Sequence, residues 1–105
     1  GLNGLQNLDY LVSLHLRYCG FDGTIPSEIG RLTKLTALTL GNNDYRGEIP
    51  SSLFQLSALE MLGIDDNFLE GNIASFGQLS NLRVLYAEDN QLTGTLSDTL
   101  LQPWT

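Results

Sequence analysis

The sequence predicts a repeat solenoid of the α/β type, with a parallel β-sheet on a concave face and irregular or short helical turns on a convex face. Four similar phrases open with a leucine, at intervals of 24, 24 and 23 residues: Leu11, Leu35, Leu59 and Leu82. A glycine in the second half of each phrase keeps the same intervals: Gly23, Gly47, Gly71 and Gly94. Because two independent columns share one period, including the one-residue deletion, the chain consists of internal repeats.

Each phrase begins with a predicted strand. Segments such as Leu38-Thr39-Leu40 alternate with a period of two, which indicates a strand buried on one side. One turn cannot bury its apolar edge alone, whereas stacked turns bury a continuous core and align their strands in a parallel sheet. The side chains predicted to point inward are those of Leu14, Leu16, Leu38, Leu40, Leu62, Ile64, Leu85 and Ala87.

The chain is expected to bend sharply after each strand, at a column that holds one cysteine and three asparagines: Cys19, Asn43, Asn67 and Asn90. A buried amide at such a bend can satisfy backbone groups of its own turn and a neighbouring one. We therefore interpret this column as a structural ladder and not as a binding stripe. The repeat pattern L-x-x-L-x-L-x-x-N/C-x-L permits cysteine here, which predicts that Cys19 is buried as a small apolar residue.

The second halves of the phrases read FDGTIPSEIG, YRGEIPSSLF and LEGNIASFG. The glycine column suits a position that needs a positive φ or close packing between turns. Later repeats replace Pro26 and Pro50 by Ala74 and Ser97, and the third phrase lacks one residue before Phe76, which predicts a tighter convex turn. Near the end, Pro103 and Trp104 break the leucine pattern, as expected of an atypical terminal turn.

These segments resemble the L-x-G-x-I-P-x-x-L-G half of plant-type leucine-rich repeats, which occur in receptor-like kinase ectodomains and polygalacturonase-inhibiting proteins. The resemblance covers roughly residues 5–100. It implies one leucine-rich-repeat domain or a fragment of one, with a partial repeat at 1–10 and repeats at 11–34, 35–58, 59–81 and 82–105. It also implies protein or peptide ligands and favours an extracellular or cell-surface location, whereas the residues themselves leave the compartment and the oligomeric state open.

The charge balance limits the classes of binding partner that fit this chain. Five basic residues against 12 acidic ones give a net charge of −7. Such a surface repels phosphate backbones, which excludes general nucleic-acid binding, and it matches a basic protein, peptide or cation better. No apolar run approaches the ~20 residues that a membrane-spanning helix needs.

No catalytic signature is found. The sequence lacks G-x-S-x-G, H-E-x-x-H, C-x-x-C and a Gly-rich phosphate loop. His15 and Cys19 are four residues apart, but they are expected on opposite sides of the backbone, where they cannot share a metal or a proton. Asp65-Asp66-Asn67 is rich in oxygen atoms but does not match the EF-hand spacing. We therefore predict no catalytic residue, cofactor or metal site, and no enzyme.

Positions between and beside the inward leucines face solvent, and stacking at about 4.8 Å aligns them in columns on the concave sheet. We predict that the polar and aromatic members of these columns contact a partner: His15, Arg17, Tyr18, Thr39, Asn42, Asp65, Asp66, Tyr86, Glu88 and Asp89. Two interpretations of their four carboxylates stay open. They form an acidic docking patch for a basic partner, or a solvated edge that promotes solubility and blunts self-association.

The sequence thus favours a non-enzymatic module that binds a protein or peptide on its concave face. The alternative is a structural or scaffolding segment of a larger assembly, for which a contiguous apolar patch on the G-x-I-P face or at the chain ends would speak. Ice or polysaccharide binding by convex residues is a third possibility. The convex column is too irregular to favour it: Thr24, Glu48, Asn72 and Thr95.

Overall fold

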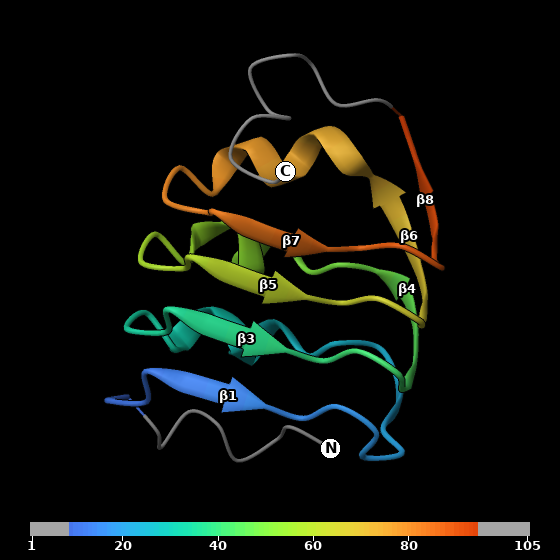
Figure 1. The fold of residues 1–105 in the computed structure, drawn as a ribbon, viewed down its shortest axis with the longest axis horizontal. Coiled ribbons are helices and arrows are strands. Elements are labelled where there is room, and N and C mark those ends of the chain that lie inside the picture. The colour runs from blue at the N-terminus through green and yellow to red at the C-terminus, as the bar shows by residue number, and fades with distance from the viewer. Residues whose placement is uncertain (1–8, 95–105) are drawn as a thin grey trace.

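The computed structural model describes residues 9–94, in which one short strand from each turn contributes to a parallel sheet. Its strands lie in the order β1-β3-β5-β7: β1 (Ser13–His15), β3 (Ala37–Thr39), β5 (Met61–Gly63) and β7 (Val84–Tyr86). Figure 1 shows these four arrows stacked in one direction. The register pairs Ala37 with Ser13 on one side and with Met61 on the other. The strands therefore pair in the register that the repeat alignment predicts, and the parallel sheet is confirmed.

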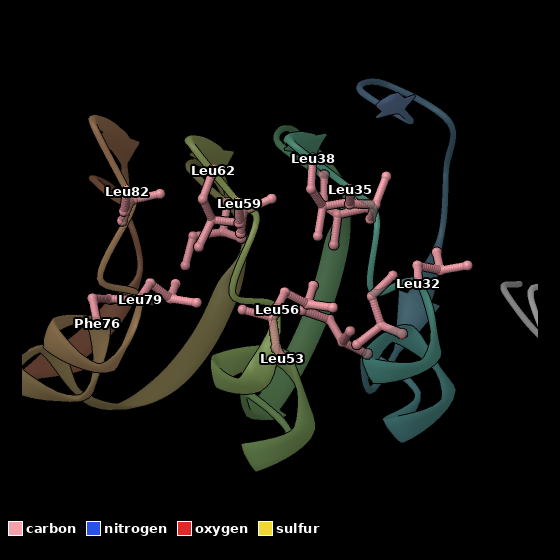
Figure 2. Close-up of a cluster of buried hydrophobic side chains, with 14 of the residues drawn as sticks. Leu32, Leu35, Leu38, Leu53, Leu56, Leu59, Leu62, Phe76, Leu79 and Leu82 are labelled. Atoms are coloured by element: carbon pink, nitrogen blue, oxygen red, sulfur yellow. The ribbon is translucent and has the colours of Figure 1, made fainter. Parts of the chain in front are cut away.

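The inner faces of the turns form one continuous core. Figure 2 shows leucines from successive turns side by side across the view, with Leu38 and Leu62 reaching in from β3 and β5. Inward residues of the two central turns are fully buried: Leu38, Leu40, Leu62 and Ile64. Those of the outer described turns are partly buried and pack against this core: Leu14, Leu16, Leu85 and Ala87. The difference follows from stacking, because an outer turn has a described neighbour on one side only.

A second parallel sheet forms in the next part of each turn, where irregular or short helical structure was expected. Its order is β2-β4-β6-β8: β2 (Asp22–Gly23), β4 (Asp44–Glu48), β6 (Phe68–Asn72) and β8 (Gln91–Thr93). In Figure 1 the labelled strands of this sheet run along one side of the stack. Glycine within these segments and proline soon after them disfavour strands by propensity. Stacking overrides that preference because each segment pairs with the same segment of the next turn.

The glycine column meets the expectation of a positive φ. Gly23 has φ 78° and Gly47 has φ 75°, a region that side chains rarely adopt. A Cβ atom at Gly47 would also lie 3.2 Å from the Thr24 Cγ2 atom of the preceding turn. Conformation and packing therefore both favour glycine at this position.

Short 3₁₀ helices return the chain to the next strand: η2 (Ser27–Arg31), η3 (Ser51–Gln55) and η4 (Ile73–Gln78). Pro26 and Pro50 cap the first two in an extended conformation. In the third turn η4 begins directly after β6, because Asn72 takes the capping position and its side chain accepts a hydrogen bond from the Ala74 amide at 2.9 Å. The missing residue is thus removed from the link between strand and helix, which gives the tighter turn predicted.

The expectations for Ser97, Pro103 and Trp104 fall outside the described residues. Across residues 9–94, no helix has both the length and the apolar character needed to cross a membrane.

Candidate binding site

The asparagines after the strands tie each turn to the one before it. Asn43 Nδ2 donates to the carbonyl oxygens of Leu16, Leu40 and Gly41, and its Oδ1 accepts from the backbone amides of Cys19 and Phe21. The corresponding bonds of the next two turns repeat this pattern, with Asn67 reaching Leu40 and Asn90 reaching Ile64. These amides are occupied by backbone groups and are not available to a partner.

Cys19 differs from the other members of its column. The prediction that it is buried is wrong, because the residue is exposed. Its Sγ lies 3.4 Å from the Arg17 carbonyl oxygen, a contact within its own turn. Asn43 and Asn67 are buried because each reaches into a preceding turn. Within the described part of the chain, no turn precedes the one that carries Cys19.

The position just before the ladder column adopts a left-handed backbone in every described turn. Its φ values lie between 55° and 61° at Tyr18, Asn42, Asp66 and Asp89. Asparagine and aspartate tolerate this conformation better than other side-chain-bearing residues. The bend therefore gives Asn42, Asp66 and Asp89 a structural reason to be there, whereas Tyr18 has none. Because the backbone turns here, these four side chains lie at the edge of the sheet.

Arg17 and Asp65 join two turns that are not neighbours. Arg17 Nη1 donates to Asp65 Oδ1 at 2.9 Å, and Nη2 donates to Oδ2 at 2.7 Å, across 48 residues of sequence. Gly41 lies between them, and a Cβ atom there would lie 2.6 Å from Asp65 Oδ1 and closer still to Arg17 Nη1. Asp65 is only 6% exposed. Of the four nominated carboxylates, it alone is held in an internal ion pair.

Beside Arg17, Gly41 and Asp65, a second column of outward-facing positions on the sheet begins with His15. The His15 Nδ1 atom lies 2.8 Å from the Thr39 hydroxyl oxygen. Thr39 is buried, Gly63 follows without a side chain, and Tyr86 is 50% exposed. Beside it, Met61 and Val84 face out from β5 and β7 as register partners. Neither residue was nominated from the sequence as a partner contact. Their apolar character, in a column that begins with Ser13, is the signal that could have identified them.

The edge residues line a shallow groove of about 440 Å³. We call it the edge groove; it is formed by Tyr18, Asn42, Asn43, Asp44, Asp66, Asn67, Phe68 and Asp89. Asp44 and Phe68 were not predicted, because both belong to the second sheet, which the sequence analysis did not anticipate. The ten nominated residues therefore divide into two groups. Six lie over the concave sheet or its continuation, and Tyr18, Asn42, Asp66 and Asp89 line the edge groove.

Carboxylates are crowded in the edge groove. Desolvation raises the pKa of Asp66, and the hydrogen bond and negative charge of Asp89 raise this pKa further. With its amide oriented to satisfy both neighbours, Asn42 accepts from Arg17 Nη2 and donates to Asp66 Oδ2, each at 3.3 Å. The Arg17–Asp65 pair thus orders one wall of the groove. Among residues 9–94, no group of three or more His, Cys, Asp or Glu side chains could hold a metal ion.

A family model described as Leucine Rich Repeat matches residues 10–32 and 81–102. A comparison with curated protein sequences finds no match. Solved structures do match. The plant peptide hormone receptor RGFR1, solved in complex with RGF2, shares 41% identity with a TM-score of 0.77, over 82% of this chain and 14% of the receptor.

Two further structures are similar. The ectodomain of the receptor kinase SOBIR1 from Arabidopsis thaliana shares 28% identity with a TM-score of 0.85, over 92% of this chain and 54% of that one. A plant ice-binding protein shares 37% identity with a TM-score of 0.78, over 86% of this chain and 29% of that protein. The chain therefore spans between about a seventh and about half of these proteins.

Proposed function

The chain is a leucine-rich-repeat protein of the plant type, and on that premise we propose that it is a non-enzymatic segment that binds a protein or peptide on the concave sheet. RGFR1 was solved with RGF2 bound, and the receptor kinase HAESA with a peptide hormone and a co-receptor. These similarities support a binding role, but fold alone does not establish one. The exposed side chains of this chain support the binding role more directly.

One observation carries the proposal: an apolar strip is exposed on an otherwise hydrogen-bonded, rigid sheet. Met61, Val84 and Tyr86 lie next to one another on β5 and β7, and Tyr86 leaves half of its surface in water. An exposed tyrosine beside aliphatic side chains is typical of the residues that dominate binding energy at interfaces. Because the strands are already paired, a partner would bind with little ordering of the backbone.

Polar groups flank this strip and would give it specificity. His15 and Thr39 continue the Tyr86 column toward the first repeat, and Arg17, with Asp65, lies beside them as a neutral pair. Glu88 is exposed in the same column as Asp65. With a net charge of −7 on the chain, a partner that combines apolar and basic residues is the best match.

The described surface gives less support to the two alternative functions, a structural role in an assembly and ice binding. Large apolar side chains are exposed at Tyr10, Val12, Tyr18, Phe68, Val84 and Tyr86. Within residues 9–94 none of these lies on a 3₁₀ helix; Phe68 lies on β6 of the second sheet, and Tyr10 and Val12 precede β1. The convex side therefore presents one exposed large apolar ring and not the contiguous patch that would favour assembly. A plant ice-binding protein is among the similar structures, but the described convex column of Thr24, Glu48 and Asn72 has no regular chemistry.

The proposal is tested by selecting binders from a random peptide display library on the immobilised protein. Isothermal titration calorimetry of the selected peptides then compares wild type with Tyr86→Ala. We expect affinity to fall about tenfold, because a buried aromatic anchor contributes more than 1 kcal/mol to an interface. Gln55→Ala, an exposed change on η3, is the control and should leave affinity unchanged. The proposal is wrong if no peptide is enriched, or if both variants weaken binding equally.

A further inference from the structure

Phe68 is exposed on the outer face of the second sheet, where no packing role accounts for it. It opens β6, and Leu69 beside it points into the core, so the strand alternation turns Phe68 outward. The ring is 47% exposed and forms the shared wall of two depressions. One is the edge groove, and the other is lined by Arg46, Phe68, Glu70 and Gln91. A large apolar side chain shared by two depressions is typical of an interaction surface.

The edge groove joins this apolar wall to negative charge. Asp44, Asp66 and Asp89 line it, and no basic side chain does. Two arginines are found outside its lining: Arg17 is paired with Asp65, and Arg46 lines the second depression, which shares Phe68 with the groove. At the other end of the groove the Tyr18 ring is 77% exposed. The groove therefore presents two exposed aromatic rings and unneutralised carboxylates to whatever enters it.

We propose that the edge groove is a docking site for a basic segment of a protein partner, with an arginine or lysine side chain lying between Asp66 and Asp89. Its charged end would meet the carboxylates, and its apolar stem would cover the Phe68 ring. Guanidinium and ammonium groups are attracted to aromatic faces as well as to carboxylates. An acidic groove of this kind rejects nucleic acid and anionic membrane surfaces, which leaves a basic protein segment as the occupant that its charge fits.

Two features of the groove agree with this occupant. Desolvation raises the pKa of Asp66, and the hydrogen bond and negative charge of Asp89 raise this pKa further. A cation placed between the two carboxylates would relieve the repulsion between them. The groove lies beyond the strand ends and shares none of its lining with the apolar strip of Met61, Val84 and Tyr86. This inference is therefore independent of the concave-face proposal, and either can fail without the other.

Nuclear magnetic resonance titration tests the inference with two model peptides. The probe is acetyl-Gly-Arg-Gly-amide, and its control carries citrulline, which keeps the shape of arginine without the charge. We expect saturable shift changes at the Asp66, Phe68 and Asp89 amides with the arginine peptide only. Equal shifts with both peptides, shifts spread evenly over the acidic surface, or no shifts would each overturn the proposal.

Variants then locate the contact. Asp89→Asn and Phe68→Ala should each weaken binding of the arginine peptide about threefold, as expected for an exposed ion pair and an exposed cation–π contact. Glu60→Gln removes an exposed carboxylate just before β5, at the opposite end of the strand, and should leave binding unchanged. Tyr86→Ala should also leave it unchanged, which separates this site from the concave strip. An effect of Glu60→Gln as large as that of Asp89→Asn would show that only net charge matters.

Discussion

At the scale of single residues, the Arg17–Asp65 pair shows how a side chain can link turns that the repeat keeps apart. The two residues belong to the first and third described turns, and the guanidinium passes over Gly41 of the second. Both guanidinium–carboxylate bonds are short, which makes this the fork geometry in which arginine binds carboxylates most strongly. Gly41 matters because any side chain there would occupy the space of the ion pair.

Gly41→Ala should therefore destabilise the protein by displacing Arg17. Gly41 has no positive φ, so the added methyl group strains no backbone angle and acts mainly by leaving the Asp65 carboxylate without its partner. We expect a loss of about 1–2 kcal/mol in the free energy of unfolding, measured by urea denaturation, since Arg17 is partly in water. Gly63→Ala is the matched control. Its Cβ would lie 3.3 Å from the Thr39 Cγ2 atom and 3.6 Å from Arg17 Nη1, which a shift of a few tenths of an ångström relieves, so it should cost clearly less. Equal losses would contradict this role for Gly41.

Tyr45 illustrates a second residue-scale effect, a buried hydroxyl without a partner. Its side chain is almost fully buried and stacks on Phe21, and its Oη has no hydrogen-bond partner in the described part of the chain. Burial raises the pKa of Tyr45 to about 12, and the nearby Cys19 adds to the rise. The folded state therefore keeps this phenol neutral at pH values where the unfolded chain already ionises it.

Tyr45→Phe should raise the free energy of unfolding near pH 8 by about 1 kcal/mol, because it removes an unsatisfied polar atom and keeps the ring. The pH dependence has a defined sign. A raised folded-state pKa gives stability that is complete below the unfolded pKa of about 10 and is lost as the pH rises toward about 12. Urea midpoints should thus fall more steeply between pH 9 and 12 in wild type than in the variant. Parallel curves would show that the Tyr45 phenol titrates normally.

At the scale of elements, the third convex turn shows how a repeat tolerates a deletion. The other two 3₁₀ helices use proline as their capping residue, and η4 uses Asn72. The core is preserved because Phe76 is fully buried at the place that Leu53 takes in the preceding turn, and its ring meets Phe54 edge-on at 5.5 Å. A shorter backbone link and a larger side chain thus give the same continuous core.

Asn72→Ala should remove the hydrogen bond that starts η4. We expect a loss of about 1 kcal/mol in the free energy of unfolding, the usual cost of an asparagine cap. Asn72→Asp keeps an acceptor in the same place, so most of the stability should be retained. Thermal and urea unfolding of the three proteins would give this order. If the two variants lose the same free energy of unfolding, the hydrogen bond donated by the Ala74 amide is not the cause. The loss would then come from the side-chain nitrogen of Asn72 or from its packing.

At the scale of the whole molecule, the period of the sequence accounts for most of the architecture but not for the candidate site. The spacing of the leucines was enough to predict the first sheet, its register and the inward residues of the central turns. This works because every stacked turn adopts the same backbone arrangement. The second sheet was missed, since its glycines and prolines mask its pairing. Burial of Cys19 was predicted wrongly, because it depends on a neighbouring turn and not on the column itself.

The chemistry of the candidate site depends on side-chain contacts and backbone bends that the aligned columns of the repeat do not reveal. Arg17 reaches Asp65 only because Gly41 is small, and this pairing across two turns cannot be read from the nearest-neighbour spacing. The edge groove depends on left-handed residues that move Asp66 and Asp89 off the sheet. It also needs Phe68 from a strand that was not predicted. Side-chain reach and backbone bends therefore decide which nominated residues meet.

Stacking also predicts how stability is distributed along the molecule. Leu62 is fully buried between turns on both sides, whereas Leu85 is half-buried on β7, the last strand of the first sheet within the described residues. Leu62→Ala should cost about 3–5 kcal/mol through its cavity, and Leu85→Ala clearly less, because an outer site can relax into the space. Apart from the Arg17–Asp65 pair, the turns pack against their immediate neighbours, so native-state hydrogen exchange should be slowest at the β3 and β5 amides and faster at β1 and β7. The opposite result would be an equal loss in the free energy of unfolding for the two substitutions, together with equal protection from hydrogen exchange in all four strands. It would mean that the molecule unfolds in a single step and not gradually from its ends.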